Sequence, residues 1–194
     1  MNCFGKQLLL LPLTCLLLPA LGFGDMKSVD ADDDRLRHQN GVLLLDGMAF
    51  TGELLSHHAD GVMQSLIDYQ NGKRDGRHLS WYDESQIKSE AFYIAGRRNG
   101  EARGWWPDGQ IQYQRVFKNG LLEGETLEWS ESGQLKYRQH YKAGREAGLQ
   151  SGWHADGEPA FSYVFRDGRR YGVIASKPCF TVNPDAKEQF NENL

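Results

Sequence analysis

The sequence predicts an all-β protein built as an elongated array of about five antiparallel β-hairpins. Glycine, tryptophan and Tyr/Phe residues each return every 24 positions, and the residues between them alternate between apolar and polar. Asn-Gly, Ala-Gly and Asp-Gly pairs recur in the same phase. Since a period of two indicates a strand and such pairs close hairpins, each 24-residue unit is predicted to be one hairpin. The main columns are Gly52, Gly76, Gly100, Gly124, Gly148 and Gly172, and Trp81, Trp105, Trp129 and Trp153.

Residues 1–24 have the features of a secretory signal peptide. Lys6 precedes an apolar run of about a dozen residues, and small residues follow it. The run is shorter than the ~20 residues that a membrane-spanning helix needs, and two prolines interrupt it. We therefore expect export to the periplasm or the extracellular space, with the signal either cleaved or kept as an anchor.

Two short segments precede the repeats. Residues 25–40 are rich in aspartate and lack apolar periodicity, which predicts a solvated acidic linker. Val42–Leu45 followed by Asp46–Gly47 predicts a strand and a tight turn. Because terminal repeats of an array need a cover, this strand is the expected N-terminal cap of a repeat domain over residues 41–172.

Residues 100–123 illustrate the unit. A first strand is expected from Gly100 to Trp105, and a turn follows it. In the second strand Tyr113 and Phe117 share one side, which predicts an aromatic-rich buried face. Equivalent residues of neighbouring hairpins lie about 10 Å apart, so the tryptophans are expected to interdigitate with the intervening strand rather than stack on each other.

The repeat phase is lost in residues 173–194, which we interpret as a C-terminal cap and tail. Cys179 is the one cysteine outside the signal segment. It is either a free thiol, an intermolecular partner or a small buried residue. A thiol or metal role of this segment stays open as one function hypothesis.

Composition and residue placement argue against several function classes. The formal net charge is −4, so no excess of basic residues favours nucleic acid. The turn carboxylates are exposed to solvent, where nothing adapts their pKa to acid–base catalysis. His57 and His58 are adjacent on a strand and point to opposite faces. The sequence therefore predicts no enzyme, no cofactor and no metal site.

The charged turns are sorted by sign. The turns that close each hairpin carry cations, whereas the turns within each hairpin carry Asp83, Asp108, Glu131 and Asp156. Hairpin geometry places the two sets on opposite long edges. In the functional interpretation, the basic edge binds anionic lipid head groups or an acidic partner. In the alternative interpretation, the edge is polar only because turns are exposed. Its members are Lys73, Arg74, Arg97, Arg98, Arg145, Arg169 and Arg170, with Leu121–Leu122 interrupting the row.

A second candidate surface follows the tryptophan column by one residue. Tyr82, Trp106 and His154 occupy this position and are expected on the face opposite the tryptophans. If exposed, they form a patch suited to a protein or a glycan. The alternative is that the termini or a second layer cover this face.

The recurring pattern resembles the MORN-repeat variant family, which includes YwqK-type antitoxin-like repeat proteins. The resemblance rests on Phe50-Thr51-Gly52 and on the repeated G-x-x-x-x-W/Y, D/S-G-x-I/L and Y/F-x-x-G elements over residues 42–172. It implies an array of β-hairpins without catalytic residues. It also implies antitoxin-like partner binding for the variant and lipid association for ordinary MORN repeats. We therefore expect an exported, non-catalytic protein-interaction scaffold, with peripheral binding to an anionic membrane as the alternative.

Overall fold

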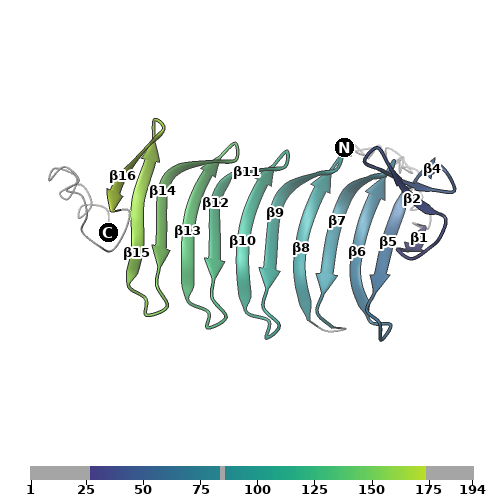
Figure 1. Cartoon of the computed structure of the whole chain (residues 1–194), viewed down its shortest axis with the longest axis horizontal. Helices are drawn as coiled ribbons and strands as arrows, with labels where there is room; N and C mark the ends of the chain where they lie inside the picture. The colour runs from purple at the N-terminus through teal and green to yellow at the C-terminus, as the bar shows by residue number, and fades with distance from the viewer. Residues whose placement is uncertain (1–26, 84–85, 174–194) are drawn as a thin grey trace, which may run out of the picture.

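The protein is a long, single sheet of hairpins with a small second sheet at its N-terminal end. The computed structural model describes residues 27–83 and 86–173, and these contain strands and turns (Figure 1). No helix in these ranges is long and apolar enough to cross a membrane. The predicted all-β hairpin array is confirmed.

The main sheet has 13 strands, in the order β1-β5-β6-β7-β8-β9-β10-β12-β13-β14-β15-β16, with β11 paired to β10. All neighbours are antiparallel except β1 and β5, which are parallel. The strands are β1 (Ser28–Asp30), β5 (Gly52–His57), β6 (Met63–Gln70), β7 (Lys73–Trp81), β8 (Ile87–Ile94), β9 (Arg97–Trp105), β10 (Ile111–Lys118), β11 (Leu121–Leu122), β12 (Gly124–Trp129), β13 (Leu135–Lys142), β14 (Arg145–Trp153), β15 (Pro159–Arg166) and β16 (Arg169–Val173).

The two-residue turns along one edge have the geometry that their sequences favour. Asn119 and Gly120 have φ values of 52° and 85°. Two successive positive φ values define the type I′ turn, whose twist matches that of paired strands. The turns also bind the preceding hairpin, since Gly120 N donates to Arg98 O at 2.8 Å and Gly96 N donates to Arg74 O at 2.8 Å. The turns at Gly72, Gly96, Gly120 and Gly144 are therefore joined to the preceding repeat by backbone hydrogen bonds.

The phased glycines have a partner in the register of the sheet. Tyr93 lies opposite Gly76, and Phe117 lies opposite Gly100. The rings do not cover these glycines, since a Cβ at Gly100 or Gly124 would meet nothing within 4 Å. A Cβ would instead overlap the ring of Tyr113 at Gly104 and the ring of Phe161 at Gly152. The pairing of a phased glycine with an aromatic residue also joins Tyr69 to Gly52, Tyr141 to Gly124 and Phe165 to Gly148. We call the side of the sheet that bears these five rings the aromatic face, and the other side the polar face.

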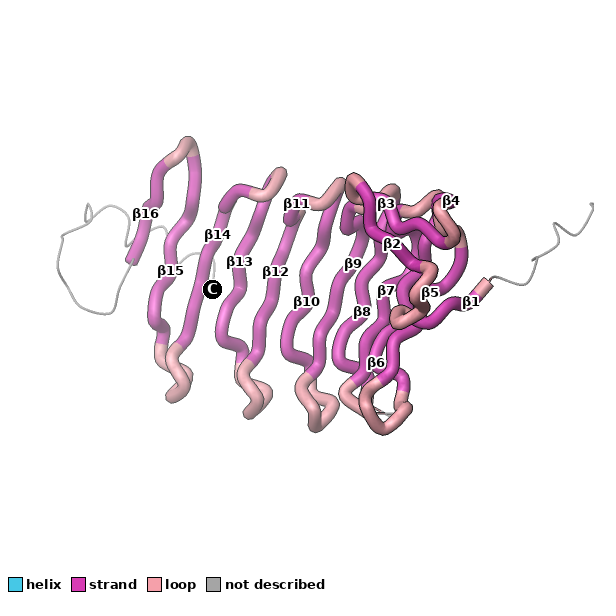
Figure 2. The backbone as a smooth tube through the Cα atoms, turned by 45° about the vertical axis from the view of Figure 1, so that its right-hand side comes forward, coloured by secondary structure: helices cyan, strands magenta, loops and turns pink. Residues whose placement is uncertain are grey.

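The N-terminal cap covers one end of the aromatic face. It is a three-stranded antiparallel sheet of β2 (Leu36–Gln39), β3 (Val42–Leu45) and β4 (Met48–Ala49), which lies over the β5–β7 end (Figure 2). Leu43 N donates to Gly72 O at 2.8 Å. The core between the layers contains Val29, Leu43, Leu45, Phe50 and Tyr69, with Leu36, Leu54 and Ile67 packed against it. The expected cap over this region is confirmed.

The predicted acidic linker over residues 25–40 is wrong where the chain forms β1 and β2. Residues 28–30 form β1, and Val29 is buried in the core. Leu36 begins β2 and packs against the same core. Single apolar residues among aspartates carry no periodic signal, yet they are buried because a distant surface receives them. The signal-peptide prediction and the interpretation of residues 174–194, Cys179 included, lie outside the described residues.

Beyond the cap the described residues form an array that is one layer thick. The predicted buried face is therefore only partly buried: Tyr93 and Tyr163 are buried, whereas Tyr113, Phe117 and Tyr137 are half-buried. Among the described residues no second layer covers the aromatic face from β8 to β16 (Figure 1). This leaves a long aromatic surface that faces solvent.

Candidate functional site

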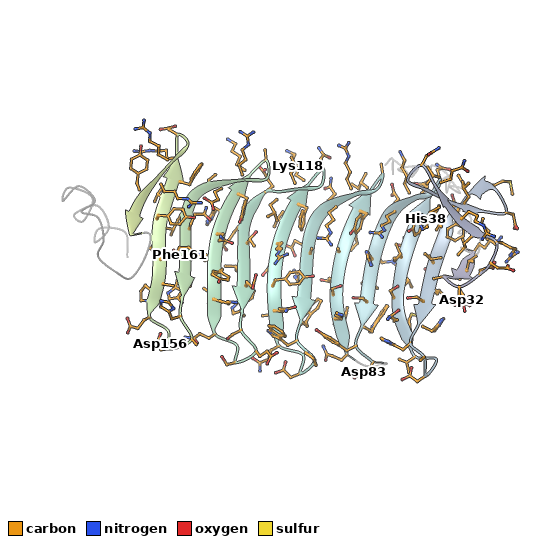
Figure 3. All side chains as sticks on the ribbon, viewed as in Figure 1. Asp32, His38, Asp83, Lys118, Asp156 and Phe161 are labelled. Carbon is orange, nitrogen blue, oxygen red and sulfur yellow. The ribbon has the colours of Figure 1, made fainter. Side chains whose placement is uncertain are left out.

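The charged turns lie on opposite long edges of the sheet. Lys118 marks the edge of the two-residue turns, whereas Asp83 and Asp156 mark the other (Figure 3). We call these the basic edge and the acidic edge. Lys118, Lys142 and Arg166 also lie on the basic edge, and sequence reasoning missed them because they end strands rather than lie within turns.

The predicted cations of the basic edge divide into two groups. The guanidinium groups of Arg74 and Arg98 lie 5.5 and 6.0 Å from the ring centre of Tyr93. Arg170 lies 5.0 Å from the ring of Tyr163 and pairs with Glu146 at 3.1 Å. These arginines are directed onto the aromatic face. The others, Lys73, Arg97, Arg145 and Arg169, are exposed and form no ion pair within the described part of the chain.

Several rings on the uncovered aromatic face contact another ring or an arginine. Tyr137 stacks on Phe161 with 6.2 Å between ring centres, and Phe161 contacts Tyr163 at 5.7 Å. Arg115 lies 4.5 Å from the ring centre of Tyr113. Cation–π and ring–ring contacts hold these side chains in place. Sequence reasoning identified the rings but assigned them to a buried side, since alternation does not reveal whether a second layer exists.

The polar face carries ion pairs that join neighbouring strands. Arg77 binds Asp68 and Glu53, each at 3.0 Å, which links β5, β6 and β7. The nearby carboxylate of Asp68 raises the pKa of Arg77. Further along, Arg103 pairs with Glu90 at 3.3 Å and Arg138 with Glu125 at 2.6 Å. Carboxylates in such pairs stabilise the sheet and do not resemble an acid–base site.

The residues that follow the tryptophan column reach the next hairpin. Tyr82 Oη donates to Trp105 O at 3.1 Å, and His58 Nε2 lies 3.4 Å from Trp81 O. Trp106 is half-buried, and its Nε1 is covered without a hydrogen-bond acceptor. His154 is exposed. Tyr82 and Trp106 thus contact the neighbouring repeat and do not stand out as an exposed patch.

Three tryptophans surround a hollow at the acidic edge, which we call the tryptophan hollow. It has a volume of about 430 Å³. Trp106 lines it together with Trp129 and Trp153, the tryptophans of the next two hairpins. The rest of its lining comes from Glu128, Ser130, Glu131, Ser132, Gln134, Leu135, Lys136, His154 and Ala155.

Gln134 fixes the wall of the tryptophan hollow. In the amide orientation that satisfies both groups, its nitrogen donates to Ala155 O at 2.8 Å and its oxygen accepts from Gly157 N at 2.9 Å. These contacts join the loops of two consecutive hairpins. The described residues contain no group of three or more His, Cys, Asp or Glu side chains placed to hold a metal ion.

The fold and its surfaces define an open array of β-hairpin repeats. Residues 74–95, 98–119 and 122–143 each match the family model of the MORN repeat variant. These matches cover three consecutive hairpins between β7 and β13, and the flanking hairpins continue the same 24-residue phase. No curated protein matches the chain significantly in sequence.

Proposed function

We propose that this protein is a non-catalytic, exported scaffold that binds a partner protein on the aromatic face between β8 and β16. The observation that carries the proposal is the contrast along that face. At β5–β7 the cap covers it, whereas the described residues provide no cover beyond that point. Rings of Tyr and Phe beside arginines are the side chains most enriched in protein interfaces.

The rings are suited to binding because they are held in place before a partner arrives. Phe161 lies between Tyr137 and Tyr163, and Arg115 lies over Tyr113. Ordering a flexible side chain at an interface costs about 0.5–1.5 kcal/mol, so fixed rings reduce this cost. The mixture of rings and arginines favours a partner with apolar and acidic side chains. Antitoxin-like capture of such a partner is the form of binding that the MORN-variant repeats imply.

The test is affinity capture from the native envelope fraction with the chain lacking residues 1–24. The aromatic-face variant is Phe161→Ala, and the matched control is Val164→Ala on the polar face of the same strand, where Val164 is exposed. We expect Phe161→Ala to lose the partner and Val164→Ala to retain it. Loss of the partner in both variants, or in neither, contradicts the assignment of the face.

Peripheral binding to an anionic membrane is the second candidate function. It is favoured by the exposed cations Lys73, Arg97, Arg145 and Arg169 along one edge. Their contribution would be electrostatic and therefore screened by salt. Co-sedimentation with vesicles decides it: binding as strong to neutral as to anionic lipid, or indifferent to salt, contradicts this candidate.

A further inference from the structure

The tryptophan hollow lies beside the proposed protein interface, since Glu128 of its lining pairs with Arg115 of the aromatic face at 3.4 Å. We propose that it is a carbohydrate-binding site that takes a chain of β-1,4-linked pyranose rings. This inference goes beyond the proposed function and does not depend on it. It rests on the shape of the hollow, its polar groups and the spacing of its tryptophans.

The size and apolar lining suit a short stretch of a sugar chain. Its volume of about 430 Å³ falls in the ~300–1,000 Å³ range of small-ligand sites. Trp129 and Trp153 are half-buried and Leu135 lies with them in the lining. A pyranose with equatorial hydroxyls has a flat C–H face, and an indole ring offers it a large rigid apolar platform.

The polar groups of the wall both donate and accept hydrogen bonds. They are the hydroxyls of Ser130 and Ser132, the carboxylate of Glu131 and the imidazole of His154. A sugar hydroxyl also donates and accepts, so this mixture matches it. Such small polar groups fix the orientation of a ligand that binds mainly by its apolar face.

The indole N–H of Trp106 favours a sugar over a cation as the ligand. It has no acceptor in the described structure, and an unsatisfied buried donor costs about 1–3 kcal/mol. The N–H is covered in this structure, so the indole must turn before a sugar oxygen can accept from it. An ammonium group, which indoles and carboxylates also attract, has only donors and leaves Trp106 unsatisfied.

The residues that line the tryptophan hollow favour a sugar over the backbone of a peptide as the ligand. Peptides that bind through their main chain add to an exposed strand edge. The tryptophan hollow is instead lined by side chains of loops and strand ends, and its loops are already joined through Gln134. Side-chain recognition of hydroxyl groups is therefore the chemistry that the hollow offers.

The spacing of the repeated tryptophans favours a chain of sugars over a single sugar. Trp129 and Trp153 occupy equivalent positions of adjacent hairpins, two strands or about 10 Å apart. In a β-1,4-linked chain alternate rings present the same face at a similar spacing. Two successive tryptophans would therefore meet two equivalent faces of an extended chain, whereas an α-1,4-linked chain curves away.

The probe is cellotetraose, titrated into the full chain while tryptophan fluorescence and amide NMR shifts are followed. We expect saturable binding with Kd in the millimolar range or tighter, and little binding of maltotetraose. Trp153→Ala should weaken binding at least about tenfold by removing one platform. Trp106→Phe replaces the indole by a smaller aromatic ring without the N–H, and should weaken binding several-fold.

The control is Trp81→Phe, in the same column but outside the tryptophan hollow. It should bind cellotetraose as the wild type does, and circular dichroism should show that all variants are folded. No saturable change up to about 10 mM cellotetraose, or unchanged affinity of folded Trp106→Phe and Trp153→Ala, overturns the proposal. So does stronger binding of tetramethylammonium than of cellotetraose. Partner capture through the aromatic face is measured separately and is unaffected by either result.

Discussion

The two ends of the array are built from the same hairpin but are stabilised in different ways. At the N-terminal end, β5 and β6 lie beneath a second layer. Leu43, which lies between the two layers, is 2% exposed. At the C-terminal end, β14, β15 and β16 form a single layer. There Leu149, Val164 and Tyr171 lie opposite one another in register on the polar face, and each is exposed.

The equivalent two-residue turns at the two ends of the array also differ in their hydrogen bonds. Gly72 and Gly168 both have φ of +74°. Gly72 N donates to Phe50 O at 2.7 Å, and Asn71 N donates to Thr51 Oγ1 at 2.9 Å. Among the described residues, the turn at Gly168 forms neither of the corresponding bonds. The 24-residue period therefore fixes the hairpin but does not make its ends equally stable, and tertiary packing decides local stability.

Removing a core side chain should reveal the difference most strongly. Leu43→Ala should lower the free energy of unfolding by about 3 kcal/mol, because it removes buried methyl groups and leaves a cavity. Leu149→Ala, at a site that is 37% exposed, should cost less than about 0.5 kcal/mol. Urea unfolding of both variants measures this. Equal losses would mean that the cap does not stabilise the array.

A methyl group at the two equivalent glycines separates backbone strain from packing. An Ala at either position adopts a left-handed conformation that costs about 1–2 kcal/mol. At Gly72 its Cβ would also lie 2.7 Å from Leu43 O and clash with the Val42 side chain, whereas nothing lies within 4 Å at Gly168. We expect Gly72→Ala to cost about 3 kcal/mol and Gly168→Ala about 1 kcal/mol.

Because repeat arrays unfold unevenly, the glycine pair is best followed by amide hydrogen exchange as well as by denaturant. Gly72→Ala should accelerate exchange in β3 and at Gly72 itself. Gly168→Ala should affect only β15 and β16. A loss of protection that is equal along the whole array would contradict local control of stability.

The sequence predicts the repeat far better than the surroundings of each repeat. The pairs Asn119–Gly120 and Ala143–Gly144 select a turn locally, and the glycine and aromatic columns fix the register through neighbours in the same hairpin. These are short-range signals, and their period made them reliable. The hairpin array and the sorting of charge to two edges follow from them.

The burial of Val29 and the exposure of the rings in β10 and β13 depend on which distant segment covers which face. No local pattern encodes this. Likewise, no local pattern predicts that Trp106 and Trp153 line one hollow, because they belong to hairpins that are not consecutive. The direction of Arg74 and Arg98 onto Tyr93 was missed for the same reason, since two cations in a turn do not reveal which one lies over a ring.

His78 lies at the boundary between the covered and uncovered parts of the aromatic face. It pairs with Ile67 of the core and lies 5.7 Å from the ring centre of Tyr93. Burial, followed by the charges of Arg74 and Arg98, lowers the pKa of His78 below its usual 6.5. The unfolded chain then binds the proton more readily than the folded protein.

This contribution to stability is present above about pH 6.5 and is lost as pH falls from there through the lowered pKa of the folded state. His78→Gln should therefore flatten the pH dependence of the unfolding free energy in that acidic window. The measurement is the difference between wild type and variant in urea unfolding at several pH values. A difference that is constant with pH, or a wild type that gains stability relative to the variant as pH falls, contradicts the assigned cause.

A substitution that completes a missing hydrogen bond at the C-terminal end should have the smallest effect on stability. That effect should be stabilising. Thr51, Asp75 and Glu123 each accept a hydrogen bond from the backbone of the next two-residue turn, at 2.9, 2.9 and 2.7 Å. Position 147, in the same 24-residue phase, is alanine and has no side-chain acceptor. Ala147→Thr places a hydroxyl near the amide of Asp167.

One added hydrogen bond should raise the free energy of unfolding by about 0.5–1 kcal/mol and slow exchange of the Asp167 amide. Ala147→Val is the matched control, since it has the shape of threonine without the hydroxyl. If valine stabilises as much as threonine, packing rather than the missing bond accounts for the gain. If neither variant slows exchange at Asp167, the last turn is separated from its neighbour by more than one absent acceptor, and the difference between the two ends lies in the backbone.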